Sequence, residues 1–324
     1  MGVVTVRSPS IASEDLEAHR RELTAYCYRM LGSGFDAEDA VQETMVRAWK
    51  ASDSFEGRSS VRSWLYRIAT NVCLDHLRGR QRRARPMELG PSRPPIEASL
   101  EHMLPEGSWV SPIADDRVLP MEADPAELAE ARDSVRLAFV AALQHLPARQ
   151  RAVLILCEVL RWRAAEVAEL LGTSVAAVNS ALQRARATMG AIDTGGTTGS
   201  DDPAGLVAQF VDAFERYDID KLVTLLREDA VQSMPPFAMW LFGRTDIVRF
   251  LVGPGGGCRD SRLIPTAANG CPAFGHYKVD PDGGHMPWAL MVLEISDDGV
   301  AGIHSFLEPA RLFPVFGLPA HLPA

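Results

Sequence analysis

The chain lacks the features that mark membrane, secreted and metal-stabilised proteins. Its 324 residues contain no run of about 18 apolar residues, and the N-terminal stretch has no long apolar core of the kind a secretory signal needs. The five cysteines are scattered and include no C-x-x-C pair, which predicts reduced, buried thiols rather than disulfides or a metal site. We therefore expect a cytoplasmic protein without a membrane segment, a metal or a cofactor.

An excess of positive charge is also missing, which at first argues against a nucleic-acid-binding protein. The net charge is −9, but residues 1–96 hold 15 basic and 12 acidic groups, and residues 134–200 hold 7 and 4. The acids gather elsewhere, with 10 against 2 basic groups in residues 97–133 and 16 against 9 in residues 201–324. Because phosphate binding depends on local patches, two weakly basic blocks remain candidates for binding nucleic acid.

Composition divides the chain into several parts. Helical patterns cover residues 14–85 and 132–190, and the stretch between them, 86–131, is acidic and proline-rich, which predicts a partly disordered linker. A Gly/Thr/Ser/Asp stretch at 191–201 predicts a flexible joint. From residue 202 onwards, a helix pair precedes strand-like runs at 261–268, 273–279, 288–295 and 300–307. The fold class is therefore multidomain, with two all-α domains and a C-terminal α+β domain.

Residues 164–186 have the pattern of a helix-turn-helix. Val167, Ala168, Leu170 and Leu171 are expected to be buried in the first helix, and Val175, Val178, Ala181 and Leu182 in the second. Gly172 would end the first helix and Ser174 would cap the second. The second helix leaves donors for base edges and phosphates exposed; they are Asn179, Ser180, Gln183, Arg184 and Arg186. An ordinary helical hairpin is the alternative.

Residues 36–49 form an amphipathic helix that Asp36 can cap. The expected buried stripe is Ala40, Val41, Met45, Ala48 and Trp49. The opposite face carries Glu38, Asp39, Gln42, Glu43, Arg47 and Lys50. A merely solvated face is the alternative to a binding surface.

Arginine and aromatic residues mix in the next segment. Between Arg58 and Arg85 there are eight arginines and a single acid, Asp75, and the aromatic residues Phe55, Trp64 and Tyr66 lie in or beside this run. Arginine neutralises phosphates and aromatic rings stack on bases, which is the combination that single-stranded or melted DNA requires. A plain basic surface is the alternative.

Together these segments resemble regions 2 and 4 of the sigma-70 family, in its extracytoplasmic-function group. The resemblance covers residues 20–83 and 132–189 and rests on AYCYRMLGSGFDAEDAVQETMVRAW, FEGRSSVRSWLYRIATNVCLDHLRGRQRR and LQHLPARQRAVLILCEVLRWRAAEVAELLGTSVAAVNSALQRAR. It implies a promoter-specific transcription initiation factor and not an enzyme.

The resemblance also implies roles for particular residues. Glu38, Asp39, Gln42, Glu43 and Arg47 would dock on the β′ clamp helices of core RNA polymerase. Phe55, Arg58, Ser60, Trp64, Arg67 and Asn71 would bind the −10 element, where a base is flipped out of the stack. Asn179, Ser180, Gln183, Arg184 and Arg186 would read the −35 element. The acidic linker would run through the active-site cleft and RNA exit path of the polymerase.

Residues 202–324 resemble SnoaL-like domains, in which a curved sheet and helices form a cone. The resemblance rests on LVAQFVDAFERYDIDKLVTLLREDAVQSMPP, MWLFGRTDIVRFL, ALMVLEI and GVAGIHSFLEP. Candidate pocket-lining residues are Trp240, His276, Tyr277, Trp288 and His304, with core packing as the alternative for each. No aspartate is placed convincingly beside a histidine.

A sigma-like chain with such a fused domain is expected to be regulated in cis, through intramolecular contact of the C-terminal domain with the sigma domains. The rival hypothesis is a DNA-tethered SnoaL-like enzyme or a ligand-sensing transcription regulator. A sigma factor of this group would bind duplex promoter DNA poorly alone and well with core polymerase, whereas the rival would bind its site without polymerase.

Overall fold

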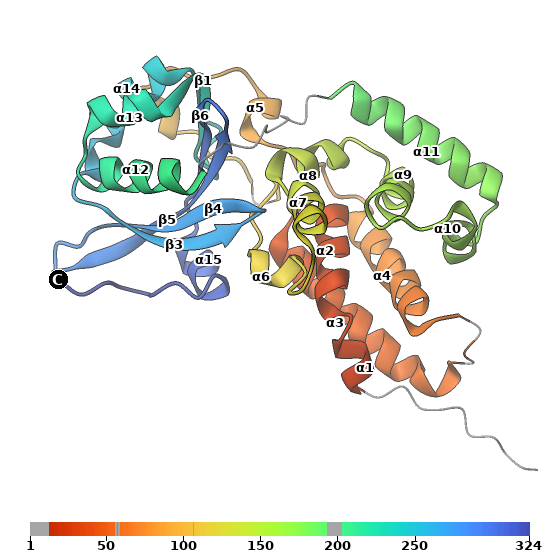
Figure 1. Cartoon of the computed structure of the whole chain (residues 1–324). Helices are drawn as coiled ribbons and strands as arrows, with labels where there is room; N and C mark the ends of the chain where they lie inside the picture. Colours follow the sequence, from red (N-terminus) through yellow and green to blue (C-terminus); the bar gives the residue numbers. More distant parts are fainter. Residues whose placement is uncertain (1–12, 56, 58, 106, 193–202) are drawn as a thin grey trace, which may run out of the picture. The chain divides into compact units, whose positions relative to one another are not determined.

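The computed structural model describes residues 13–324 except 56, 58, 106 and 193–202. The chain forms two compact units (Figure 1). We call Met1–Arg82 with Asp116–Thr194 the helical unit, and Arg83–Asp115 with Gly195–Ala324 the sheet unit. Most of the expected joint at 191–201 lies outside the described residues.

The helical unit contains both predicted all-α segments. Its elements are α1 (Ser13–Glu17), α2 (Arg20–Leu31), α3 (Gly34–Ala51), the short η1 (Ser52–Ser54), α4 (Val61–Leu77), α6 (Asp115–Val118), α7 (Pro125–Asp133), α8 (Leu137–Gln144), α9 (Ala148–Leu154), the π-helical η3 (Ile155–Val159), α10 (Ala164–Leu171) and α11 (Val175–Gly190). No helix in the described part of the chain is long and apolar enough to cross a membrane.

Local sequence signals set the helix ends. Gly172 ends α10 with a φ of 61°, a left-handed value that glycine adopts without steric cost. Ser174 caps α11 as predicted, because its hydroxyl accepts a hydrogen bond from the amide of Ala177 at 3.2 Å. Helix α3 starts earlier than predicted, since its cap is Ser33 and Asp36 already lies in the first turn.

The two all-α segments pack on each other within the helical unit. The guanidinium group of Arg151 in α9 donates hydrogen bonds to the carbonyl oxygen of Met30 in α2 and to Oε1 of Gln144 in α8. Burial lowers the pKa of Arg151 to about 10, so it stays charged at neutral pH. A buried charge needs such partners, and its bonds therefore fix α2 against α8 and α9.

The sheet unit is built on six strands in the order β2-β1-β6-β5-β4-β3. Its elements are α5 (Pro86–Leu89), η2 (Glu97–Leu100), α12 (Pro203–Glu215), α13 (Ile219–Leu225), β1 (Leu226–Ser233), β2 (Trp240–Phe242), α14 (Arg244–Val252), η4 (Pro254–Cys258), β3 (Arg262–Ala268), β4 (Cys271–Val279), β5 (His285–Ser296), β6 (Gly299–Phe306) and α15 (Pro309–Val315). Strands β1 and β6 are parallel and the other pairs antiparallel. The four predicted strands are confirmed as β3 to β6. Strands β1 and β2 were not predicted.

One apolar core joins the sheet to helices α12, α13 and α14. Phe210 of α12, Phe250 of α14 and Leu293 of β5 are among its buried members. Leu100, from the proline-rich stretch, packs against the same core. Residues 83–115 are held along the rest of the sheet unit by backbone hydrogen bonds, so this part of the predicted linker, 86–131, is ordered rather than partly disordered.

Candidate nucleic-acid interface

Helix α3 presents the predicted polar face to solvent. Asp39, Gln42 and Arg47 are exposed, and Glu38 and Glu43 are half-buried. Arg47 Nη2 donates a hydrogen bond to Glu43 Oε1 at 2.5 Å. The structure therefore gathers all five residues along one helix surface.

Glu43 has a second partner in α4. Its Oε2 lies 3.3 Å from Nε2 of His76. Burial alone would raise the pKa of Glu43, but the hydrogen bonds from His76 and Arg47 outweigh it and hold this pKa below its usual range. Because Glu43 also ties α3 to α4, Asp39 is the cleaner position at which to test docking.

Two apolar side chains lie beside this polar face. Trp49 is 67% exposed and Val46 is 45% exposed. The prediction that Trp49 belongs to the buried stripe is wrong. Position 49 lies about 100° around the helix from the buried Ala48, and two turns after the exposed Gln42, so its side chain points to the same side as that of Gln42. Sequence reasoning missed both as surface residues, and their i+4 and i+7 spacing from the exposed Gln42 was the signal available.

An aromatic pair lies at the start of α4. The rings of Phe55 and Trp64 are 5.0 Å apart between centroids and tilted by 47°. Ser60 caps α4, because its hydroxyl accepts a hydrogen bond from the amide of Ser63 at 3.1 Å. Arg58 lies outside the described residues. The structure thus brings Phe55, Ser60 and Trp64 together at one end of the helix.

Arg67 and Asn71 follow Trp64 along one face of α4, at i+3 and i+7. Asn71 is exposed. Arg67 is half-buried and its Nη2 lies 3.9 Å from Oε1 of Glu169 in α10. The middle of the face predicted to bind the −10 element therefore lies beside α10.

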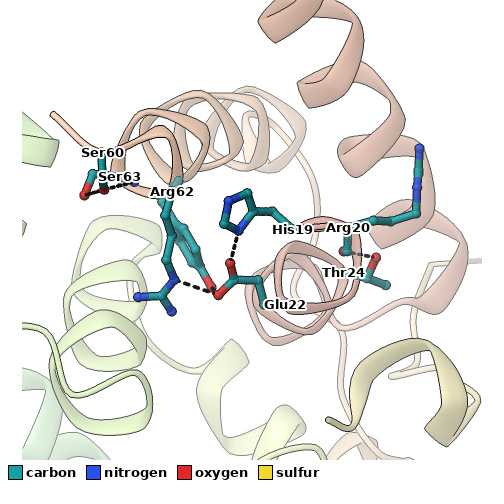
Figure 2. Close-up of polar contacts among 8 residues, drawn as sticks. His19, Arg20, Glu22, Thr24, Ser60, Arg62 and Ser63 are labelled. Carbon is teal, nitrogen blue, oxygen red and sulfur yellow. Dashed lines mark hydrogen bonds and ion pairs between the residues drawn. The ribbon is translucent and has the colours of Figure 1, made fainter. Parts of the chain in front are cut away.

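Tyr66 is not available for stacking on bases, contrary to the prediction. Its ring is fully buried, and its hydroxyl donates to Oε2 of Glu22 at 3.2 Å. Figure 2 shows the same carboxylate accepting from Nε of Arg62 at 2.8 Å and pairing with Nδ1 of His19 at 2.5 Å. Burial raises the pKa of Tyr66 and keeps the hydroxyl protonated as a donor.

Arg62 links α4 to the second all-α segment. Its guanidinium carbon lies 5.2 Å from the ring centroid of Tyr66 and 5.3 Å from that of Trp162, which precedes α10. Arg62 is one of the eight arginines between Arg58 and Arg85. Its position between two rings instead makes it a packing residue of the helical unit.

Helices α10 and α11 form the predicted helix-turn-helix (Figure 1). Val167 and Ala168 of α10 and Val178 of α11 are buried as expected. Val175 is 43% exposed, so the prediction that it is buried is wrong. It opens the first turn of α11, where no neighbouring helix covers it, and Ala185 contributes to the buried face instead.

All five predicted recognition residues on α11 are exposed. Asn179, Gln183, Ser180 and Arg184 fall within about 140° of the helix circumference at 100° per residue. Arg184 Nη1 donates to Ser180 Oγ at 2.8 Å. Arg186 lies on the flank, where its Nη2 pairs with Glu158 Oε1 at 2.5 Å. The structure therefore places Asn179, Ser180, Gln183 and Arg184 on one exposed face, whereas the side chain of Arg186 points towards η3.

The sheet unit encloses a small cavity of about 30 Å³. Of the five candidate pocket residues, His276 and Trp288 line it, together with Gln232 and Cys258. Trp240, Tyr277 and His304 do not. Adjacent residues of a strand point to opposite faces, so Tyr277 turns away from the cavity that His276 faces.

His304 has a polar environment that the sequence did not indicate. Its Nδ1 lies 2.8 Å from Ser233 Oγ, and its Nε2 lies 3.4 Å from Oε2 of Glu294. Gly302 makes room for this contact, because a Cβ there would lie 2.9 Å from the His304 ring. The acid is a glutamate ten residues away, brought close by the β5–β6 pairing.

His276 is expected to make the sheet unit sensitive to acid. It is buried with its Nε2 2.9 Å from Ser261 Oγ, and burial lowers its pKa to about 3. Below pH 6.5 this histidine binds a proton in the unfolded chain but not in the folded chain. The free energy of unfolding therefore has its full value above pH 6.5 and decreases as the pH drops below it. Between pH 6.5 and 4.5 the loss is about 2 kcal/mol at 1.36 kcal/mol per pH unit.

Hydrogen exchange of β4 amides at pH 6.5 and 4.5 measures this loss. In the His276→Gln variant, we expect the difference between the two pH values to shrink by most of that amount. An unchanged pH dependence in the variant would mean that other groups cause the acid sensitivity.

Comparison with known proteins agrees with this geometry. The family model of Sigma-70 region 2 matches residues 16–83, which span α2, α3 and α4. The model of Sigma-70, region 4, matches residues 136–189, which include the helix-turn-helix. The ECF RNA polymerase sigma factor SigG of Mycobacterium tuberculosis is 48% identical over 322 residues, covering 96% of this chain and 84% of SigG. The chain belongs to the ECF RNA polymerase sigma factors.

Other relatives agree with this assignment. SigJ of Mycobacterium tuberculosis is 29% identical to this sigma factor over 248 residues, which are 74% of this chain and 72% of SigJ. The crystal structure of SigJ superposes with a TM-score of 0.60 at 24% identity, covering 95% of this chain and 100% of that one. The shared fold extends through the C-terminal SnoaL-like cone.

Proposed function

We propose that this sigma factor binds core RNA polymerase in the cytoplasm, recognises −35 and −10 promoter elements and promotes DNA opening. The observation that carries the proposal is the exposed face of α11, formed by Asn179, Ser180, Gln183 and Arg184, within a chain that is similar to SigG over nearly its whole length. A recognition helix with such donors reads base edges in the major groove.

The remaining sites follow from the helical unit. The α3 surface around Asp39 and Gln42 supports binding to the polymerase clamp. The pair Phe55–Trp64, with Asn71 further along α4, supports capture of a flipped base at the −10 element. The C-terminal domain would modulate these activities in cis.

We propose no enzymatic activity. The rival hypothesis, a DNA-tethered enzyme or ligand sensor, gains no support from the relatives that match this chain. The cavity that His276 lines is about 30 Å³, whereas pockets for small molecules usually measure about 300–1,000 Å³.

Run-off transcription with core polymerase and a genomic promoter library tests the proposal. Transcripts from defined start sites that require the chain would support it. Binding of promoter DNA in the absence of polymerase, without polymerase-dependent transcription, would favour the rival.

Trp49 and Val46 are expected to contribute to polymerase binding. The double variant Val46→Ser/Trp49→Ser should raise the Kd for core polymerase about tenfold, which corresponds to about 1.4 kcal/mol and is typical of a residue at an interface centre. Folding should be little affected, because neither side chain belongs to the buried core. Competition binding against the unmodified chain measures the change.

Val252→Ser is the matched control, since Val252 is 59% exposed on α14 of the sheet unit. We expect it to leave the Kd unchanged. An unaltered Kd in the double variant would exclude this part of α3 from the polymerase interface.

A further inference from the structure

Within the sheet unit, the stretch 83–115, which we call the strap, is bound at three places to the part formed by residues 203–324. At the first, Trp240 Nε1 of β2 donates to the carbonyl oxygen of Gly90 at 2.8 Å. The amide of Arg93 donates to the carbonyl oxygen of Trp240 at 2.9 Å. Trp240, assigned from sequence to a pocket, is thus an anchor for the strap at an edge strand of the sheet.

The second place is the turn between β1 and β2. The amide of Leu104 donates to the carbonyl oxygen of Pro236 at 3.0 Å, and the amide of Ala238 donates to that of His102 at 3.0 Å. Met103 and Phe237 lie opposite each other between these bonds, as an antiparallel bridge. The strap here uses both a backbone donor and a backbone acceptor.

The third place is the turn between β3 and β4. The amide of Asn269 donates to the carbonyl oxygen of Ile113 at 3.1 Å, and Asn269 Oδ1 accepts from the amide of Ile113 at 3.1 Å. The amide of Gly270 donates to Asp115 Oδ1 at 2.8 Å. The strap is therefore held at both ends and in the middle.

While it is bound in this way, the strap cannot also run through the active-site cleft and RNA exit path of the polymerase, which is the path that the resemblance implies for it. We infer that the rest of the sheet unit sequesters the strap, and that the strap must leave its three binding places before transcription can start. This inference rests on the proposed function. The backbone amides and carbonyl oxygens of the strap that form these hydrogen bonds cannot at the same time bind the polymerase.

Release would also lengthen the connection between α4 and α6. The strap holds about 33 residues, which reach roughly 110 Å when fully extended at 3.3–3.6 Å per residue. Elements at −35 and −10 are separated by about 25 base pairs, or roughly 85 Å at 3.4 Å per base pair. The released strap is therefore long enough to span this distance once the contacts of Arg151 with α2 and of Arg62 with Trp162, which hold the two helical segments together, have also opened.

A reversible disulfide across the second place tests the inference. Opposed residues of an antiparallel bridge have Cα atoms about 4.5–5.5 Å apart, which suits a disulfide. In full-length Met103→Cys/Phe237→Cys, we expect oxidation to reduce run-off transcription at least tenfold and reductant to restore it. Equal transcription by the oxidised and reduced forms would overturn the inference.

The matched control is His285→Cys/Leu322→Cys, which links another antiparallel bridge of the sheet unit without involving the strap. Its oxidation should leave transcription unchanged, as should oxidation of the unmodified chain. If the unmodified chain and the reduced variants all fail to transcribe, the proposed function fails rather than the release.

Hydrogen exchange of the unmodified chain gives an independent readout. The amides of Ala238 and Asn269 donate to strap carbonyl oxygens, so we expect both to exchange at least tenfold faster when core polymerase is bound. The amide of Gly243, bonded to Ala230 within the sheet unit, should keep its rate. Unchanged protection of Ala238 and Asn269 in the polymerase complex would overturn the inference.

Discussion

The Arg184→Ala variant is expected to transcribe from its own promoter about 10- to 100-fold less than the unmodified chain, the range for loss of a good base contact. Arg184 is exposed near the middle of α11, and its bond to Ser180 orients the guanidinium group across the exposed face. The loss should be specific to the −35 sequence, while binding to core polymerase stays unchanged. Run-off transcription on promoters with altered −35 elements measures it.

Arg20→Ala is a suitable control for this variant. Arg20 is a partly exposed arginine of α2 that pairs with Glu17 and is not among the predicted DNA-binding residues. We expect it to transcribe normally. If Arg184→Ala weakened all promoters equally and reduced the salt dependence of binding, Arg184 would contact a phosphate rather than a base.

The second large effect is expected at Trp64. Stacking of a base on an aromatic side chain contributes about 1–3 kcal/mol, so Trp64→Ala should reduce strand opening about 10- to 100-fold. Closed-complex formation should persist, because α3 and α11 are unchanged. Permanganate reactivity of thymines in the −10 element measures opening directly.

Trp64→Phe separates stacking from folding. A phenylalanine keeps a ring beside Phe55, so this variant should recover most of the opening. Equal loss of opening and of closed-complex formation in Trp64→Ala would indicate that Trp64 only supports the packing of the loop at residues 55–60.

Features that depend on neighbouring residues were predictable from the sequence. The turn at Gly172, the cap at Ser174 and strands β3 to β6 all appear where local signals placed them. Strand β1 was missed because its sequence, LREDAVQS, lacks the alternation that a half-buried strand shows. Its pairing with β6 decides its conformation.

The predictions of burial were wrong where packing against another helix decides which face of a helix is buried. Helical spacing placed Trp49 and Val175 next to buried residues, but both lie where no other helix reaches them. Tyr66 and Arg62 lie in an arginine-rich run typical of DNA binding, yet both contact Glu22 from α2. The spacing of residues in the sequence predicts the direction of a side chain on its helix, but only the packed structure shows which residues that side chain contacts.

The sequence by itself determined the family, the helix-turn-helix and the polar donors that α11 exposes, because short-range capping and periodicity specify them. Only the tertiary structure decided that the strap follows the sheet unit, that Trp240 anchors it and that His304 meets Glu294. Most of the strap contacts involve backbone groups, which every residue carries and no composition reveals. The contact of His304 with Glu294 depends on the register between β5 and β6.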